Sequence, residues 1–187
     1  VIAFGADHGE SLGERDYWFA HGEHLTDVLV RVPLFFRIPG HKPRRRDDVV
    51  SLVDLYGTLV RMLTGSPVVR NPHGRDLFAD GASRQASAPY MATLGASSVP
   101  RYGLIEAGFK WIVTELDGVA TGELYRLGDD RTDLAAANPK LAARMRERLA
   151  AVRGKLDRST AERRPDLSDD DRENLRALGY IDGYIDD

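Results

Sequence analysis

The sequence predicts an α/β fold, and three patterns support that prediction. An apolar run at residues 1–4 ends at a glycine-rich turn and resembles a short strand. Apolar residues recur at helical spacing over residues 25–32, 51–63 and 138–156. Short β-type runs, separated by Gly and Pro, occupy residues 89–127.

The first strand leads directly to a candidate metal site. Its short, uninterrupted apolar run is typical of a buried strand in a parallel sheet, and ligands gather at the C-terminal ends of such strands. Asp7 and His8 follow it. Their oxygen and nitrogen donors suit zinc, manganese or calcium, and Gly9 would let the backbone turn beside an ion. Alternatively, Asp7 caps the next turn and His8 is an ordinary loop residue.

A second candidate begins at His21, in another His-Gly pair preceded by aromatic residues. Because imidazole titrates near neutral pH, His21 could serve as a ligand, as a proton donor to a leaving group, or as a positive contact for an anionic substrate. His24 is expected to be a surface or capping residue. The helix at 25–32 should end at Pro33, before a strand at 34–38.

The middle of the chain predicts a helix and then a small sheet. The helix from Ser51 to Leu63 should end at Gly65. Short strands are expected at residues 89–93, 102–106, 109–116 and 123–127, and they suit an antiparallel sheet. Apolar residues fall on both faces of the third strand. Lys110 could reach a site from there, but the simpler expectation is a surface lysine.

The C-terminal region predicts a packing helix, a linker and a short helix. The apolar stripe of the packing helix is Leu141, Met145, Leu149, Val152 and Leu156. Pro139 falls near its first turn. Residues 158–166 are charged and are expected to form a linker. Ser168 and Asp171 have the spacing of a capping box, and Gly179 would end the short helix.

Composition indicates a folded, soluble protein. The chain is 42% hydrophobic and 29% charged, with a formal net charge of −3. No run is long enough to span a membrane, and nothing indicates nucleic acid as a partner. The basic cluster at residues 42–46 is expected to be a solvated loop. The absence of cysteine is compatible with the cytoplasm and with a disulfide-free periplasmic protein.

Several motifs carry a family resemblance. Residues 5–14 read G-A-D-H-G-E-S-L-G-E, residues 21–22 read H-G, and residues 31–34 read R-V-P-L. Residues 50–59 read V-S-L-V-D-L-Y-G-T-L, with Gly57 where proline is common. This order of motifs resembles the sulfatase-like members of the alkaline phosphatase superfamily.

The resemblance continues towards the C-terminus. Residues 74–77 (G-R-D-L), 109–112 (F-K-W-I) and 123–127 (E-L-Y-R-L) are similar to later family motifs. Asp133 stands where the family usually has asparagine, and the tail at 175–180 is similar to an ending found in many bacterial members. The resemblance therefore runs nearly end to end.

This resemblance implies a fold and a domain organisation. Residues 1–65 would be the C-terminal part of an alkaline-phosphatase-like α/β/α sandwich, with the metal loop. Residues 66–157 would form a small antiparallel sheet with a packing helix, and residues 158–187 a linker and short C-terminal helix. An N-terminal half of the same fold, with any export signal, is expected upstream of Val1. A periplasmic or extracellular location would suit the family.

The resemblance also implies roles for the candidate residues. Asp7 and His8 take the place of two ligands of a divalent metal ion, with calcium the first choice and manganese or zinc the alternatives. His21 falls where sulfatases often carry a lysine that contacts the substrate and where related transferases carry a histidine. His21 is therefore the candidate catalytic residue, acting on an anionic ester substrate.

The implied reaction is displacement at sulfur or phosphorus by a formylglycine or threonine held on the metal. The chain has no cysteine and no C-x-P-S-R or S-x-P-S-R motif. We therefore expect the nucleophile upstream, and the isolated chain to be inactive. The leading function is hydrolysis of sulfate, phosphate or phosphonate esters. The alternatives are a phosphoethanolamine-type transferase and a non-catalytic binding or relict module.

Overall fold

The computed structural model has mixed α/β structure, which confirms the predicted fold class; it describes residues 1–66, 74–79, 88–93, 99–160 and 168–177. The chain forms two compact units. The first contains Val1–Gly9 and Val32–Pro89, and the second contains Glu10–Arg31 and Tyr90–Asp187. Among the described residues, no helix has both the length and the apolar character needed to cross a bilayer.

The first unit contains a two-stranded sheet. Strand β1 (Ile2–Gly5) pairs with β4 (Leu34–Arg37) in antiparallel register, with Phe4 opposite Phe35. Both strands were expected, but the prediction that β1 is buried in a parallel sheet is wrong for this pairing: the run is exposed throughout and its described partner is antiparallel. An apolar run indicates a strand, yet it carries no information about the direction of the neighbouring strand.

Helix α2 (Asp54–Thr64) completes the first unit and ends as predicted. Gly65 adopts a left-handed conformation with φ of 71°, which closes the last turn. Asp54 is fully buried and accepts hydrogen bonds from the backbone N–H groups of Ser51 (3.0 Å) and Arg75 (2.8 Å). Two motifs far apart in the sequence therefore meet at one carboxylate, which gives both a structural role.

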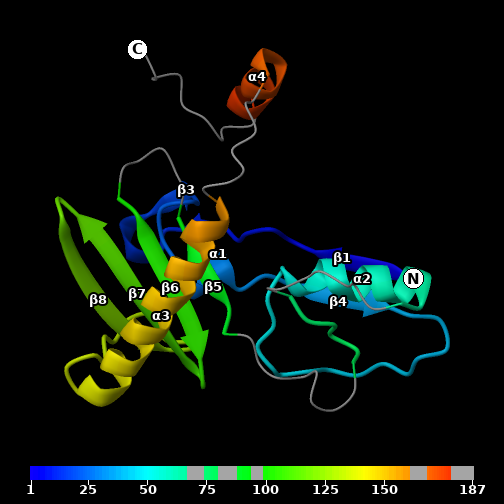
Figure 1. Cartoon of the computed structure of the whole chain (residues 1–187), viewed down its shortest axis with the longest axis horizontal. Coiled ribbons are helices and arrows are strands. Elements are labelled where there is room, and N and C mark those ends of the chain that lie inside the picture. The colour runs from blue at the N-terminus through cyan, green and yellow to red at the C-terminus, as the bar shows by residue number, and fades with distance from the viewer. Residues whose placement is uncertain (67–73, 80–87, 94–98, 161–167, 178–187) are drawn as a thin grey trace. The chain divides into compact units, whose positions relative to one another are not determined.

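The second unit is built on a four-stranded antiparallel sheet, as predicted (Figure 1). Its strands pair in chain order and are β5 (Tyr90–Ala92), β6 (Arg101–Glu106), β7 (Phe109–Leu116) and β8 (Val119–Arg126). The β8 strand begins earlier than the predicted residue 123, because Val119 to Gly122, which follow the 117–118 turn, also pair with β7.

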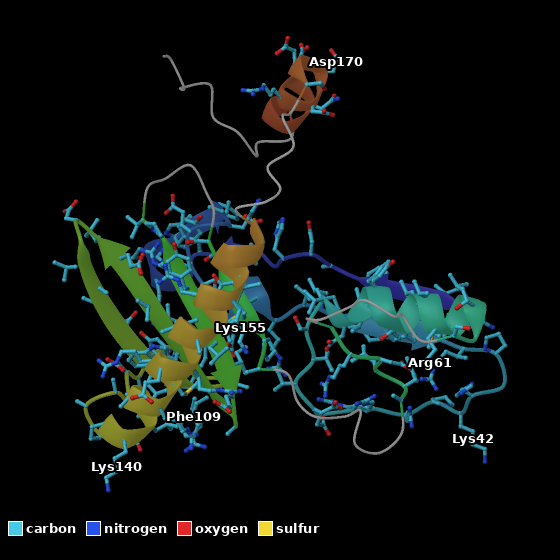
Figure 2. The ribbon with its side chains drawn as sticks, in the orientation of Figure 1. Lys42, Arg61, Phe109, Lys140, Lys155 and Asp170 are labelled. Carbon is cyan, nitrogen blue, oxygen red and sulfur yellow. The ribbon has the colours of Figure 1, made fainter. Side chains whose placement is uncertain are left out.

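Helix α3 (Pro139–Thr160) crosses one face of this sheet and contacts β6, β7 and β8 (Figure 1). Met145 and Leu149 of the predicted stripe are buried, so this stripe is core packing. Lys140, near the start of α3, points out into solvent (Figure 2). The helix extends to Thr160, so the predicted linker starts later than residue 158.

The opposite face of the sheet is covered by the segment 10–31. Its elements are β2 (Ser11–Leu12), the 3₁₀ turn η1 (Glu14–Asp16), β3 (Trp18–Ala20) and α1 (Asp27–Val30). Leu25 packs with Ile112 and Tyr125 in the core. The predicted helix at 25–32 is confirmed only as the single turn α1, because Thr26 and Arg31 are extended at its two ends.

Helix α4 (Asp169–Ala177) starts with the predicted capping box. The Asp171 carboxylate accepts a hydrogen bond from the Ser168 backbone N–H at 3.2 Å, and the Ser168 hydroxyl accepts one from the Asp171 N–H at 3.2 Å. Gly179 and the tail lie outside the described residues.

Candidate functional site

Asp7 and His8 follow β1 in the first unit. The side chain of Asp7 is 76% exposed and that of His8 is 37% exposed. The backbone N–H of His8 donates to Oδ1 of Asp7 at 3.0 Å, and His8 Nε2 lies 3.8 Å from the other carboxylate oxygen, Oδ2. The carboxylate therefore supports the local turn with one oxygen and directs the other towards the imidazole.

The ring of His8 is oriented by a second hydrogen bond. Its Nδ1 lies 2.9 Å from the carbonyl oxygen of Gly9. Because a carbonyl oxygen only accepts hydrogen bonds, Nδ1 carries the proton, and in the neutral ring Nε2 bears the lone pair. A backbone carbonyl commonly fixes a metal-binding histidine in this way.

The donor spacing fits a single divalent cation. Two atoms bound to one ion are separated by no more than twice the metal–ligand distance, about 4 Å for zinc and about 5 Å for calcium. The 3.8 Å between His8 Nε2 and Asp7 Oδ2 meets both limits. One anionic oxygen and one neutral nitrogen also suit a cation chemically. The residues present therefore fit the group that the motif implies.

His21 belongs to the second unit, where it is paired with Glu10. Its Nδ1 lies 2.9 Å from Glu10 Oε2, and the two side chains are 44% and 42% exposed. The Tyr17 hydroxyl donates to the His21 carbonyl oxygen at 2.7 Å, which also fixes the backbone. Sequence reasoning missed Glu10. Hairpin pairing is the pattern that could have revealed this residue. Ser11 pairs with Ala20, and the residues that flank this pair are Glu10 and His21.

The turn between β2 and β3, and β3 itself, contain residues with unusual backbone geometry. Arg15 and Asp16 both have φ of 57°, and Phe19 has φ of 46°. Such conformations persist where surrounding contacts hold them, and they cluster at functional sites. Arg15 donates to the Tyr125 hydroxyl at 2.9 Å. Burial raises the pKa of Tyr125 to about 12, so the tyrosine remains a neutral partner in this contact.

The prediction that Lys110 lies on the surface is wrong. Its side chain is fully buried, with Nζ 2.5 Å from Asp27 Oδ1 and 2.6 Å from Asp130 Oδ1. Asp27 Oδ2 also accepts the Gly128 backbone N–H at 2.7 Å. Local patterning could not reveal this burial, because the carboxylate of Asp27 is distant in the sequence. The three side chains Lys110, Asp27 and Asp130 are called the buried ion cluster below.

His24 is also less exposed than expected. Its ring is half-buried and meets the Tyr17 ring edge-on, with the centroids 4.8 Å apart. Burial lowers the pKa of His24, and the positive charge of Arg101 lowers it further. His24 therefore has a packing role in the second unit.

Residues 1–66 match the protein-family model described as Sulfatase. We call these residues the sulfatase-family segment, after the model that they match. The match confirms the recognised family over about a third of the chain, and it contains all three predicted site residues, Asp7, His8 and His21. It supports a sulfatase-superfamily function in general and a hydrolase-type enzyme family. No curated protein matched the chain.

Proposed function

We propose that the sulfatase-family segment supplies metal ligands and a substrate-contacting imidazole to a hydrolase of sulfate esters or of related phosphate or phosphonate esters. The observation that carries this proposal is the geometry of Asp7 and His8. Their donor atoms lie 3.8 Å apart, and the His8 ring is held with Nδ1 against a carbonyl oxygen. This arrangement lies within the residues that match the family model.

Asp7 and His8 would hold the cation, for which calcium is our first choice and manganese or zinc the alternatives. A bound divalent cation lowers the pKa of the nucleophile and offsets charge on the non-bridging oxygens of the ester. Asp7 contributes a negative charge and His8 a neutral nitrogen. We assign the nucleophile to another segment of the same fold, because the 187 residues contain neither cysteine nor the S-x-P-S-R motif.

His21 would act on the substrate. A sulfate or phosphate ester is anionic, so a protonated imidazole stabilises it by charge and by hydrogen bonding. The same imidazole could donate its proton to the departing oxygen. Glu10 favours both roles, because its carboxylate lies 2.9 Å from Nδ1 and thus orients the ring.

Metal binding is the first test of this proposal. Isothermal titration of the chain with calcium, manganese and zinc should give saturable binding by at least one of them. Asp7→Ala and His8→Ala should each weaken that binding about tenfold or more, because each removes a ligand. His41→Ala is the matched control, since His41 is an exposed loop histidine in the same unit. Unchanged binding in both ligand variants would refute the metal assignment.

Turnover of aryl sulfates and aryl phosphates is the second test, in a protein that contains the nucleophile segment. His21→Ala should lower turnover and leave metal affinity unchanged, because His21 is assigned to the substrate. Loss of metal in this variant would make His21 a ligand instead. Metal binding without turnover of any such ester would favour the non-catalytic module.

A further inference from the structure

Tyr17 contacts the backbone of the candidate catalytic residue His21. The Tyr17 hydroxyl donates a hydrogen bond to the His21 carbonyl oxygen, and the two oxygen atoms are 2.7 Å apart. Burial raises the pKa of Tyr17, and the negative charge of Glu23 raises it further. The phenol therefore stays protonated at neutral pH, which is the form that donates this hydrogen bond.

The ring of Tyr17 is fixed by the half-buried ring of His24. The two rings meet edge-on, with their centroids 4.8 Å apart. Between His21 and His24, the carbonyl oxygen of Glu23 accepts a hydrogen bond from the guanidinium group of Arg101, the first residue of β6. The loop that follows His21 is therefore joined to the sheet of the second unit, and Tyr17 approaches the loop from a fixed direction.

The backbone that leads to Tyr17 is held in an unfavourable conformation. Arg15 and Asp16 both have φ of 57°, in the left-handed region that side chains disfavour. The Arg15 guanidinium group donates to the Tyr125 hydroxyl at 2.9 Å and to the Asp130 carbonyl oxygen. Tyr17 follows directly and is extended, with φ of −104°. The contacts of Arg15 therefore maintain the turn from which Tyr17 extends.

His21 has a neighbour that makes a backbone contact useful. Gly22 has φ of 93°, and glycine adopts more backbone conformations than any other residue. The chain beside His21 could therefore shift if nothing restrained it, and the Tyr17 hydrogen bond provides a restraint. Glu10 acts on the other part of the residue, because its carboxylate lies 2.9 Å from Nδ1 of the ring. Tyr17 and Glu10 thus restrain the backbone and the side chain respectively.

We propose that Tyr17 is a positioning residue for His21, whose imidazole it keeps beside Glu10 by holding the His21 backbone. Tyr17 need not touch the substrate to affect the reaction, because a displacement of about 1 Å in a reacting group can lower its rate about 100-fold. The expected effect on turnover rests on the proposed function. The placement of the imidazole does not, since it can be measured without metal or substrate.

Nitrogen NMR of the histidine rings tests this placement in the whole chain. Tyr17→Phe removes the hydroxyl and keeps the ring. It should shift the ring resonances of His21 in the same direction as Glu10→Gln does, because both variants weaken the same contact, and it should change those of His24 much less. Tyr56→Phe is the matched control, because Tyr56 is an exposed tyrosine of the first unit. It should leave the His21 resonances unchanged.

A comparison of single and double variants tests the effect on turnover, in a protein that contains the nucleophile segment. Tyr17→Phe should lower kcat/KM for an aryl sulfate or aryl phosphate about tenfold. In the His21→Ala background it should have no further effect, because no imidazole is left to position. Metal affinity should not change. A residue that only stabilised the fold would lower kcat/KM in both backgrounds.

Three results would overturn the positioning role. They are His21 resonances that do not respond to Tyr17→Phe, an equal response to Tyr56→Phe, and equal losses of kcat/KM with and without the His21 imidazole. Failure of the proposed function would give a different result. His21→Ala would then leave turnover unchanged, whereas the response of the His21 resonances to Tyr17→Phe would remain.

Discussion

The buried ion cluster and the exposed site residues use the same kinds of side chain in opposite ways. Lys110, Asp27 and Asp130 have side-chain exposures of 0%, 16% and 15%. By contrast, the Asp7 side chain is 76% exposed and the His21 side chain 44% exposed. Charged groups enclosed by protein must satisfy one another, whereas charged groups open to solvent remain accessible to a ligand. Exposure therefore separates the structural ion cluster from the residues that we propose as site residues.

Within the buried ion cluster, both carboxylate oxygens of Asp27 have a hydrogen-bonding partner. Asp27 binds Lys110 with one carboxylate oxygen and the Gly128 N–H with the other. Its own backbone N–H donates to Asp130 at 2.5 Å, which satisfies a donor in the first turn of α1. The cluster thereby joins α1, β7 and the turn after β8 within the second unit.

The largest expected effect comes from breaking this cluster. Asp27→Ala should lower the free energy of unfolding by about 3–5 kcal/mol, because it leaves a buried lysine with one of its two partners. Urea denaturation followed by circular dichroism measures the change. Glu147→Ala, on the exposed face of α3, is the control and should have little effect. A loss below about 1 kcal/mol for Asp27→Ala would mean that solvent reaches Lys110.

His24, which is half-buried, should have an intermediate effect on stability, through the pH dependence of the free energy of unfolding. Its pKa is lowered in the folded state from the ordinary 6.5, so the unfolded chain binds more protons as the pH falls below that value. The stabilisation is therefore complete above about pH 6.5 and is lost at lower pH. His24→Phe keeps an aromatic ring and cannot titrate.

Urea denaturation of wild type and His24→Phe at about pH 7.5 and about pH 5.5 measures this dependence. The variant should lose less free energy of unfolding between the two values than wild type does. His41→Phe, at an exposed loop, should behave as wild type. Equal losses in wild type and His24→Phe would show that burial of His24 does not contribute.

The smallest effect on stability is expected at the exposed motif. Without metal, Asp7→Ala and His8→Ala should change the free energy of unfolding by less than about 0.5 kcal/mol, because surface substitutions remove few contacts. With calcium at about 100 times its dissociation constant, wild type should gain about 2.7 kcal/mol and the variants much less. Thermal unfolding with and without calcium measures the contrast. Equal gains in stability for wild type and the two variants would show that calcium binds at another site.

Much of the local structure could be predicted from the sequence. The helical stripe that contains Met145 and Leu149, the end of α2 at Gly65 and the Ser168 capping box all depend on residues within a few positions of one another. The strands of the second-unit sheet were likewise indicated by short apolar runs between turns. The predicted domain boundaries and the roles of Asp7, His8 and His21 remain predictions.

The sequence by itself determined the α/β class, most helices and strands, and the sulfatase-like motifs, because periodicity, caps and turn residues act over short distances. Only the tertiary structure decided that β1 pairs antiparallel with β4, that Lys110 is buried and that Glu10 faces His21. It also decided that the segment 10–31 packs with the sheet formed by β5 to β8. These features depend on which distant segments of the chain come together. A local sequence pattern does not record that choice, because it is set by burial and strand pairing across the whole fold.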